Sequence, residues 1–203
     1  MDASPVELRV LGCLIEKQRT TPDAYPLSLN ALRLACNQST NRDPVVDYDE
    51  ETIRAALQRL GGRGWTRLAS GAGSRAVKYR HLFGEALGLD DADLALLAVL
   101  MLRGPQTLGE LKSRTERLHR FESIAAVEES LISLGERELV ARLPRRPGQK
   151  EERFAHLLGG DADEASAGAA PVPLPVADDR LTRLERRVDA IEEELAELRS
   201  RVG

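Results

Sequence analysis

The sequence of 203 residues has few of the features that mark several common classes of protein. Its two cysteines, Cys13 and Cys36, are too few for the disulfide framework of a small secreted domain. One Trp, three Tyr and three Phe are too few for a stacking platform that binds single-stranded nucleic acid. The N-terminus has no basic segment followed by an apolar stretch, so we expect no signal peptide. Together these features predict a cytoplasmic protein.

Long hydrophobic runs are also missing. The longest, residues 94–102, has nine residues between Asp93 and Arg103, whereas a membrane-spanning helix needs about 20. We therefore expect no membrane association. The spacings typical of zinc sites, phosphate-binding loops and serine nucleophiles are absent as well. The sequence predicts no catalytic residue, no metal site and no cofactor.

The formal net charge of −4 is unevenly distributed along the chain. Residues 159–203 carry 11 acids and 6 bases, a net charge of −5, whereas residues 1–158 carry 22 acids and 23 bases, a net charge of +1. Within the first part, residues 52–84 contain seven bases and no acid. Electrostatic inferences must therefore be made segment by segment.

An internal repeat is the most informative feature of residues 1–158. Ile53, Leu57 and Gly61 match Val127, Leu131 and Gly135 at a constant offset of 74 residues. Tyr79 and His81 match Phe154 and His156 at an offset of 75. The recurrence of His81 and His156 two residues after an aromatic residue indicates a shared packing or hydrogen-bonding role. Two such copies predict two similar domains in tandem.

Each copy has the pattern of three helices followed by a β-hairpin. Capping boxes at Ser4–Glu7 and Thr107–Glu110 predict helix starts, and short β-branched and aromatic runs predict the strands. Three helices closed by a basic hairpin are typical of the winged helix, a helix-turn-helix variant. We expect a mainly α fold with small β-hairpins. The predicted units are winged-helix domain 1 over residues 1–86, winged-helix domain 2 over 87–158, a flexible linker over 159–177 and a coiled-coil helix over 178–203.

Several runs resemble one known family. They are residues 11–18 (LGCLIEKQ), 25–32 (YPLSLNAL), 41–45 (NRDPV) and 101–107 (MLRGPQT). In these runs the chain resembles the YceH-like proteins, a bacterial family of unassigned function, over about residues 4–158. The resemblance implies a tandem winged-helix fold. It implies no enzymatic activity, no cofactor and no established partner.

The third helix of a winged helix usually enters the major groove of DNA, and its hairpin contacts the backbone. In the first copy we expect this helix to expose Glu51, Arg54 and Gln58, of which Arg54 and Gln58 can bond base edges. Asp49, Glu50 and Glu51 would repel phosphate at the start of the helix, and a simple solvated face is an equal alternative. The candidate nucleic-acid-binding residues are Arg42, Arg54, Gln58, Arg75, Lys78, Arg145, Arg146 and Lys150.

The third helix of the second copy fits DNA less well. Its expected exposed positions are Ala125, Glu128, Glu129 and Ile132, with no base among them. An exposed Ile beside two acids is better suited to a protein contact. Bases on the second helix and the hairpin could bind phosphate, or could simply pair with neighbouring glutamates.

The polar loop at residues 37–44 (NQSTNRDP) occurs only in the first copy. Long ordered loops often carry function, and Arg42 is the candidate within this one. Asn, Ser and Asp side chains can equally fold such a loop onto its own backbone, and we favour that structural role.

The acidic C-terminal segment has a heptad pattern. Its predicted interface residues are Leu181, Leu184, Val188, Ile191, Leu195, Leu198 and Val202. In a parallel homodimer the flanking charges would pair favourably, as Arg180 with Glu185 of the second copy does. The alternative is a single amphipathic helix that packs on the rest of the chain.

Two functional hypotheses follow from the sequence. The first is a non-enzymatic DNA-binding or regulatory protein, dimeric through the coil, whose basic hairpins contact the phosphate backbone of double-stranded DNA. The second is an adaptor that uses its winged helices to dock another protein. The fold favours the first hypothesis, and the acids of the third helices favour the second.

Overall fold

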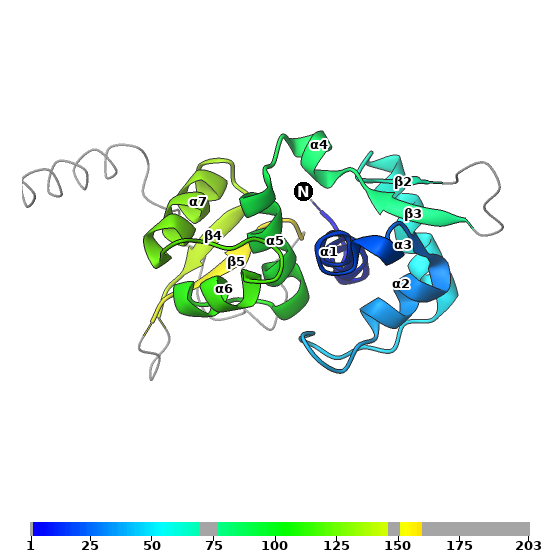
Figure 1. Cartoon of the computed structure of the whole chain (residues 1–203), viewed down its shortest axis with the longest axis horizontal. Helices are drawn as coiled ribbons and strands as arrows, with labels where there is room; N and C mark the ends of the chain where they lie inside the picture. The colour runs from blue at the N-terminus through cyan, green and yellow to red at the C-terminus, as the bar shows by residue number, and fades with distance from the viewer. Residues whose placement is uncertain (1, 70–76, 146–150, 160–203) are drawn as a thin grey trace, which may run out of the picture.

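The computed structural model describes residues 2–69, 77–145 and 151–159, and in these ranges the chain is mainly helical with two small antiparallel sheets (Figure 1). The predicted linker beyond its first residue, Gly159, and the predicted coil lie outside the described residues, as do Arg75, Arg146 and Lys150.

The first half of the molecule is built around helix α1. Its elements are α1 (Pro5–Thr20), the 3₁₀ helix η1 (Pro22–Ala24), β1 (Leu27–Ser28), α2 (Leu29–Cys36), α3 (Glu50–Gly62), β2 (Thr66–Leu68) and β3 (Lys78–His81). Strand β3 lies between β1 and β2 in an antiparallel sheet. Leu27 pairs with Tyr79 and Thr66 pairs with His81.

The second half repeats this order after the short helix α4 (Phe83–Leu87). Its elements are α5 (Asp91–Arg103), α6 (Leu108–Thr115), α7 (Ile124–Glu136), β4 (Val140–Leu143) and β5 (Arg153–His156). Gln106 and Phe154 exchange backbone hydrogen bonds of 3.0 and 2.8 Å. Gln106 therefore occupies the place that β1 takes in the first half, next to the last strand.

Most of the helices begin at residues whose side chains cap the N-terminal backbone NH groups. Ser4 and Glu7 form a capping box at α1, and Thr107 and Glu110 form another at α6, as predicted. Asp49 caps α3 through a bond of 2.8 Å from the backbone NH of Thr52. These local signals explain why the helices begin where the sequence pattern indicates.

Helix α5 lies at the centre of the molecule and joins the two halves. Every residue from 94 to 102 is buried, because α1 covers one side of α5 while α6, α7 and β5 pack on the others. A helix that is apolar all round is stable only when it is covered all round. The two halves therefore share one hydrophobic core, in which Leu11 and Leu14 of α1 meet the apolar residues of α5.

Gly12 is the point at which α1 and α5 come closest. A Cβ atom on Gly12 would lie 2.9 Å from Cγ and 3.0 Å from Cδ2 of Leu102, and 3.3 Å from Cβ of Met101. Glycine is needed here for space, because α1 holds ordinary helical geometry at this residue.

The loop between α2 and α3 is folded onto the protein by side-chain bonds, which is the structural role that the sequence favoured. Asn37 donates to the backbone oxygen of Tyr48 (2.8 Å) and accepts from its NH (2.9 Å). Arg9 of α1, itself buried, donates to the backbone oxygens of Cys36 and Pro44 at 3.1 and 2.7 Å.

The sequence predicted Arg42 as a nucleic-acid contact, and the structure contradicts this because the Arg42 side chain is 0% exposed. It forms a bidentate ion pair with Glu16 of α1, at 2.6 and 3.2 Å. Its guanidinium also donates to the backbone oxygens of Ala35 and Asn41 and to Gln38. Burial alone would raise the pKa of Glu16, but the hydrogen bonds and charge of Arg42 lower it below its usual value. Arg42 fixes the loop and is not available to phosphate.

We predict that Gly12→Ala destabilises the protein by about 1–3 kcal/mol, because Leu102 or the helix axis must move to admit the methyl group. Gly109→Ala is the matched control, since Gly109 is exposed in α6 and its Cβ would meet nothing within 4 Å. The control should be neutral or stabilising by up to about 1 kcal/mol. Urea unfolding measures both changes, and equal stabilities for the two variants would contradict the close contact.

We also predict that Arg42→Ala lowers the free energy of unfolding by about 3 kcal/mol, since it removes a buried guanidinium and leaves the part-buried Glu16 carboxylate with Lys17 alone as its ion-pair partner among the described residues. Arg120→Ala breaks an ion pair with Glu116 that is largely exposed and should change stability by less than about 1 kcal/mol. Thermal unfolding of the two variants tests the difference. If Arg42→Ala and Arg120→Ala lowered the unfolding midpoint equally, the structural role of the buried Arg42 would be wrong.

Candidate nucleic-acid interface

Helix α3 presents the polar face that the sequence predicted. Ile53, Leu57 and Leu60 are buried against the core. Arg54 and Gln58 are exposed one turn apart on the opposite side, and Glu51 precedes them. No ion pair or hydrogen bond engages Arg54 within the described residues.

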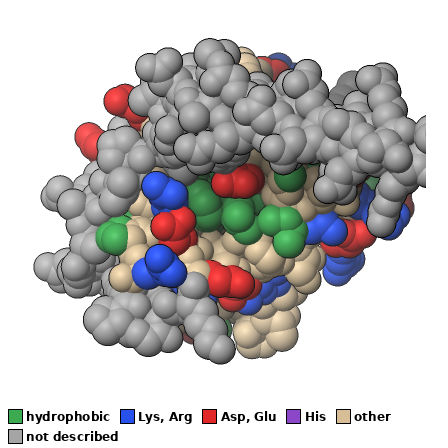
Figure 2. Space-filling view, turned by 90° about the vertical axis from the view of Figure 1, so that its left-hand side faces the viewer, with side chains coloured by type: hydrophobic (Ala, Val, Ile, Leu, Met, Phe, Trp, Pro, Cys, Tyr) green, Lys and Arg blue, Asp and Glu red, His purple; other side chains and the backbone are tan. Residues whose placement is uncertain are grey.

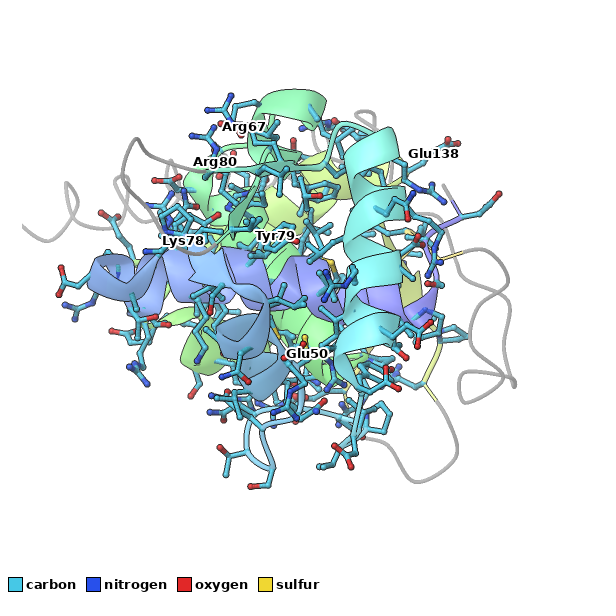
Figure 3. All side chains as sticks on the ribbon, turned by 90° about the vertical axis from the view of Figure 1, so that its right-hand side faces the viewer. Glu50, Arg67, Lys78, Tyr79, Arg80 and Glu138 are labelled. Carbon is cyan, nitrogen blue, oxygen red and sulfur yellow. The ribbon has the colours of Figure 1, made fainter. Side chains whose placement is uncertain are left out.

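A groove of about 390 Å³ separates α3 from the β2–β3 hairpin. Its polar lining comes from Arg54 and Gln58 of α3 and Arg67 of β2, and its apolar floor from Leu57, Leu68 and Tyr79. Figure 3 shows Tyr79 on the side of the hairpin that faces α3. The fold thus brings Arg54 and Gln58 of the helix next to a cation of the hairpin, Arg67.

The β2–β3 hairpin carries a basic face. Arg67 lies directly opposite Arg80 in the ladder, and Lys78 falls on the same face because side chains alternate along a strand. Arg80 pairs with Glu85 at 3.0 Å. Arg67 and Lys78 have no partner in the part of the chain that the structure describes. Like charges placed opposite each other destabilise a hairpin, and here only Arg80 of the opposed pair has a carboxylate partner among the described residues.

Two other basic side chains of residues 52–84 already have partners within the protein. Arg59 pairs with the buried carboxylate of Glu7 at 2.7 Å. Arg63 lies 5.5 Å from the ring centroid of Trp65 and donates to the backbone oxygen of Asp2. The cations available to a ligand are therefore Arg54, Arg67 and Lys78.

The acids of α3 are separated from the basic face of the hairpin. Asp49, Glu50 and Glu51 occupy the cap and first turn of the helix, where they complement its dipole. Figure 3 shows Glu50 at the opposite end of the view from Arg67 and Arg80. A phosphate backbone could approach the last turns of α3 and the hairpin without passing these carboxylates, whereas Arg54 lies one turn after Glu50 and Glu51 and is next to them.

The corresponding surface of the second half has a different character. On α7, Ala125 and Glu129 are exposed, whereas Glu128 and Ile132, also expected at the surface, are half-buried. Ile124 at the start of α7 is 50% exposed. Figure 2, which views this side, shows hydrophobic side chains at the centre with acidic ones above and below them.

The two hairpins do not share one face of the molecule. In Figure 1 the β2–β3 hairpin extends to the right and the β4–β5 hairpin to the lower left. Arg145, an exposed candidate, follows β4 and so lies far from Arg54 and Lys78. Arg142 of β4 pairs with Glu152 at 3.2 Å. Of the candidates, the structure brings together Arg54 and Gln58, and it adds Arg67, which lines the same groove and whose position depends on strand register. Lys78 does not line this groove and lies on the hairpin face opposite Tyr79.

His81 has the structural role that its repetition suggested. It is buried, and its Nε2 lies 2.6 Å from Oε1 of Gln18. Burial lowers the pKa of His81 to about 4, so the ring is neutral at pH 7. Among residues 2–69, 77–145 and 151–159, no three His, Cys, Asp or Glu residues form a group that could hold a metal ion. No helix in the same ranges has the length and apolarity needed to cross a membrane.

Comparisons with known proteins agree on one family. The family model described as "Protein of unknown function, DUF480" matches residues 3–149. A UPF0502 protein of Pelobacter propionicus is 52% identical over 201 residues, covering 95% of this chain and 91% of the relative. A UPF0502 protein of Opitutus terrae is 51% identical and covers 93% and 82%. One from Serratia proteamaculans is 46% identical and covers 99% and 94%. The chain therefore belongs to this bacterial DUF480 family, whose function is unassigned.

Proposed function

We propose that this protein is a tandem winged-helix protein that binds double-stranded DNA through α3 and the β2–β3 hairpin of its first half. The order of three helices and a hairpin recurs in both halves, with strand β1 in the first and the single bridge of Gln106 in the second between the first two helices, and this is the order of a winged helix. The third helix of that fold is the element that enters the major groove, and here it is α3.

The observation that carries the proposal is the set of unpaired cations around one groove. Arg54 and Gln58 offer the donors and acceptors that read guanine and adenine. Arg67 lines the same groove, and Lys78 lies with Arg67 and Arg80 on the basic face of the hairpin, where phosphates run in a winged-helix complex. No acid occurs between residues 52 and 84 to repel the backbone. Phosphate binding would also relieve the repulsion between Arg67 and Arg80.

A protein-docking role is the second candidate, and α7 supports it. Ile124 and Ala125 are exposed at the start of α7, close in sequence to the acids Glu128 and Glu129. Apolar surface beside acids is unsuited to DNA and suits a protein. We assign this surface of the second half to the adaptor hypothesis, separate from the DNA contact. The parallel homodimer through residues 178–203 stays a prediction of the sequence.

The DNA-binding proposal predicts that the full chain binds a labelled duplex of mixed sequence at low salt, with affinity that falls steeply as salt rises. The double variant Arg67→Ala/Lys78→Ala should weaken binding. It should also reduce the slope of log Kd against log salt by about two, roughly one for each lost phosphate contact. Fluorescence anisotropy over a salt series gives both quantities.

Arg117→Ala is the matched control, because Arg117 is exposed at the end of α6 with no partner in the described ranges and lies outside the groove. It should leave affinity and slope unchanged. Wild-type protein that fails to bind at low salt, or a double variant with the wild-type slope, would refute the proposal. Because the proposal places DNA on the first half, we expect Ile124→Asp in α7 to leave the affinity for the duplex unchanged. A reduced affinity would show that α7 binds DNA as well.

A further inference from the structure

A polar pocket of about 290 Å³ lies where the two halves meet, and DNA binding does not use it. The first half contributes Asn41, Arg42 and Asp43 from the α2–α3 loop. The second half contributes residues from the end of α5, the loop that follows it, α6 and the start of β5. These are Arg103, Pro105, Gln106, Glu110, Arg114 and Arg153.

Positive charge is in excess in this pocket. Arg114 and Arg153 share a single carboxylate, that of Glu110, at 3.4 and 3.1 Å. Arg103 has no carboxylate within 4 Å among the described residues, and its side chain donates to Oδ1 of Asn41. Burial and the positive charges of Arg114 and Arg42 lower the pKa of Arg103. Three guanidinium groups thus face one shared glutamate and the exposed Asp43.

The charges are held on rigid supports. Glu110 is fixed because it also accepts the backbone NH of Thr107 at 3.0 Å in the capping box of α6. Arg153 donates to the backbone oxygen of Pro105 at 2.8 Å. Asp43, from the other half, is tied to α5 by a bond of 2.9 Å from its NH to the oxygen of Leu102. Preorganised donors bind a ligand at a lower entropic cost than mobile surface side chains.

Gln106 adds an unsatisfied acceptor to the pocket wall. The residue is 3% exposed, and its Nε2 donates to the backbone oxygens of Arg103, Gly104 and Pro105 at 3.0, 3.3 and 3.0 Å. This fixes the orientation of the amide, and its Oε1 is buried without a hydrogen-bond partner.

We propose that this pocket is a binding site for a small phosphorylated molecule, whose phosphoryl group is held by Arg103, Arg114 and Arg153. Guanidinium forks bind phosphoryl oxygens in bidentate pairs, and a phosphoryl group offers three acceptor oxygens to the three guanidinium groups, one more than a carboxylate does. The volume is at the lower limit of small-molecule sites, which are about 300–1,000 Å³. Since Asn41 and Asp43 line the same pocket, the ligand touches both halves.

The test uses the full chain with pyrophosphate and inorganic phosphate as probes, and sodium chloride at matched ionic strength as the reference. Isothermal titration calorimetry should detect a saturable site for at least one phosphate probe. Ligand binding to the native state should also raise the thermal unfolding midpoint above that in chloride. Arg103→Gln and Arg114→Gln should each weaken the dissociation constant about tenfold or more, because each removes a charge-assisted contact.

Arg117→Ala is the control, since Arg117 is exposed and lines neither this pocket nor the groove beside α3, and it should leave phosphate binding unchanged. Arg114→Gln covers the case in which Arg103→Gln fails to fold, because the Arg114 side chain is partly exposed. Three outcomes would overturn the proposal. The first is that neither phosphate probe shows saturable binding beyond that of chloride. The second is that Arg114→Gln and the wild type bind the probe equally. The third is that Arg114→Gln loses affinity for the DNA duplex while no small-anion site is detected.

Discussion

The contact of α1 with α5 is the constraint on which the rest of the structure depends. Gly12 lets the two helix backbones approach, and the apolar residues of α5 are then covered on every side. Because this contact joins the first helix of each half, it sets the direction in which both hairpins extend. It also creates the pocket between the α2–α3 loop and α6. The candidate DNA surface and the candidate anion site are both consequences of one helix pair.

Local signals in the sequence predicted much of the fold, and contacts between distant residues account for what it missed. The capping residues and the apolar periodicity of α3 gave the helix boundaries and the exposure of Arg54 and Gln58. The burial of Arg42 could not be inferred locally, because it depends on Glu16, which lies 26 residues earlier. An arginine in a polar loop resembles a surface residue until its carboxylate partner is placed beside it.

The candidate site shows the same division. Helical spacing places Arg54 and Gln58 on one face, but the role of Arg67 depends on the register that sets it against Arg80. Register in a hairpin follows from its turn and its buried face. The anion pocket had no sequence signal, since it is assembled from two loops and three elements. A partial hint was the run at residues 101–107, which contains Arg103 and Gln106.

The opposed arginines of the β2–β3 hairpin have a further consequence for how the protein responds to its ionic surroundings. Screening by salt weakens the repulsion between Arg67 and Arg80, so added salt tightens the hairpin of the free protein. The same screening weakens its attraction for a polyanion. Amide hydrogen exchange in this hairpin would therefore slow under the conditions in which the duplex is released. Local order and ligand affinity would vary in opposite directions with ionic strength.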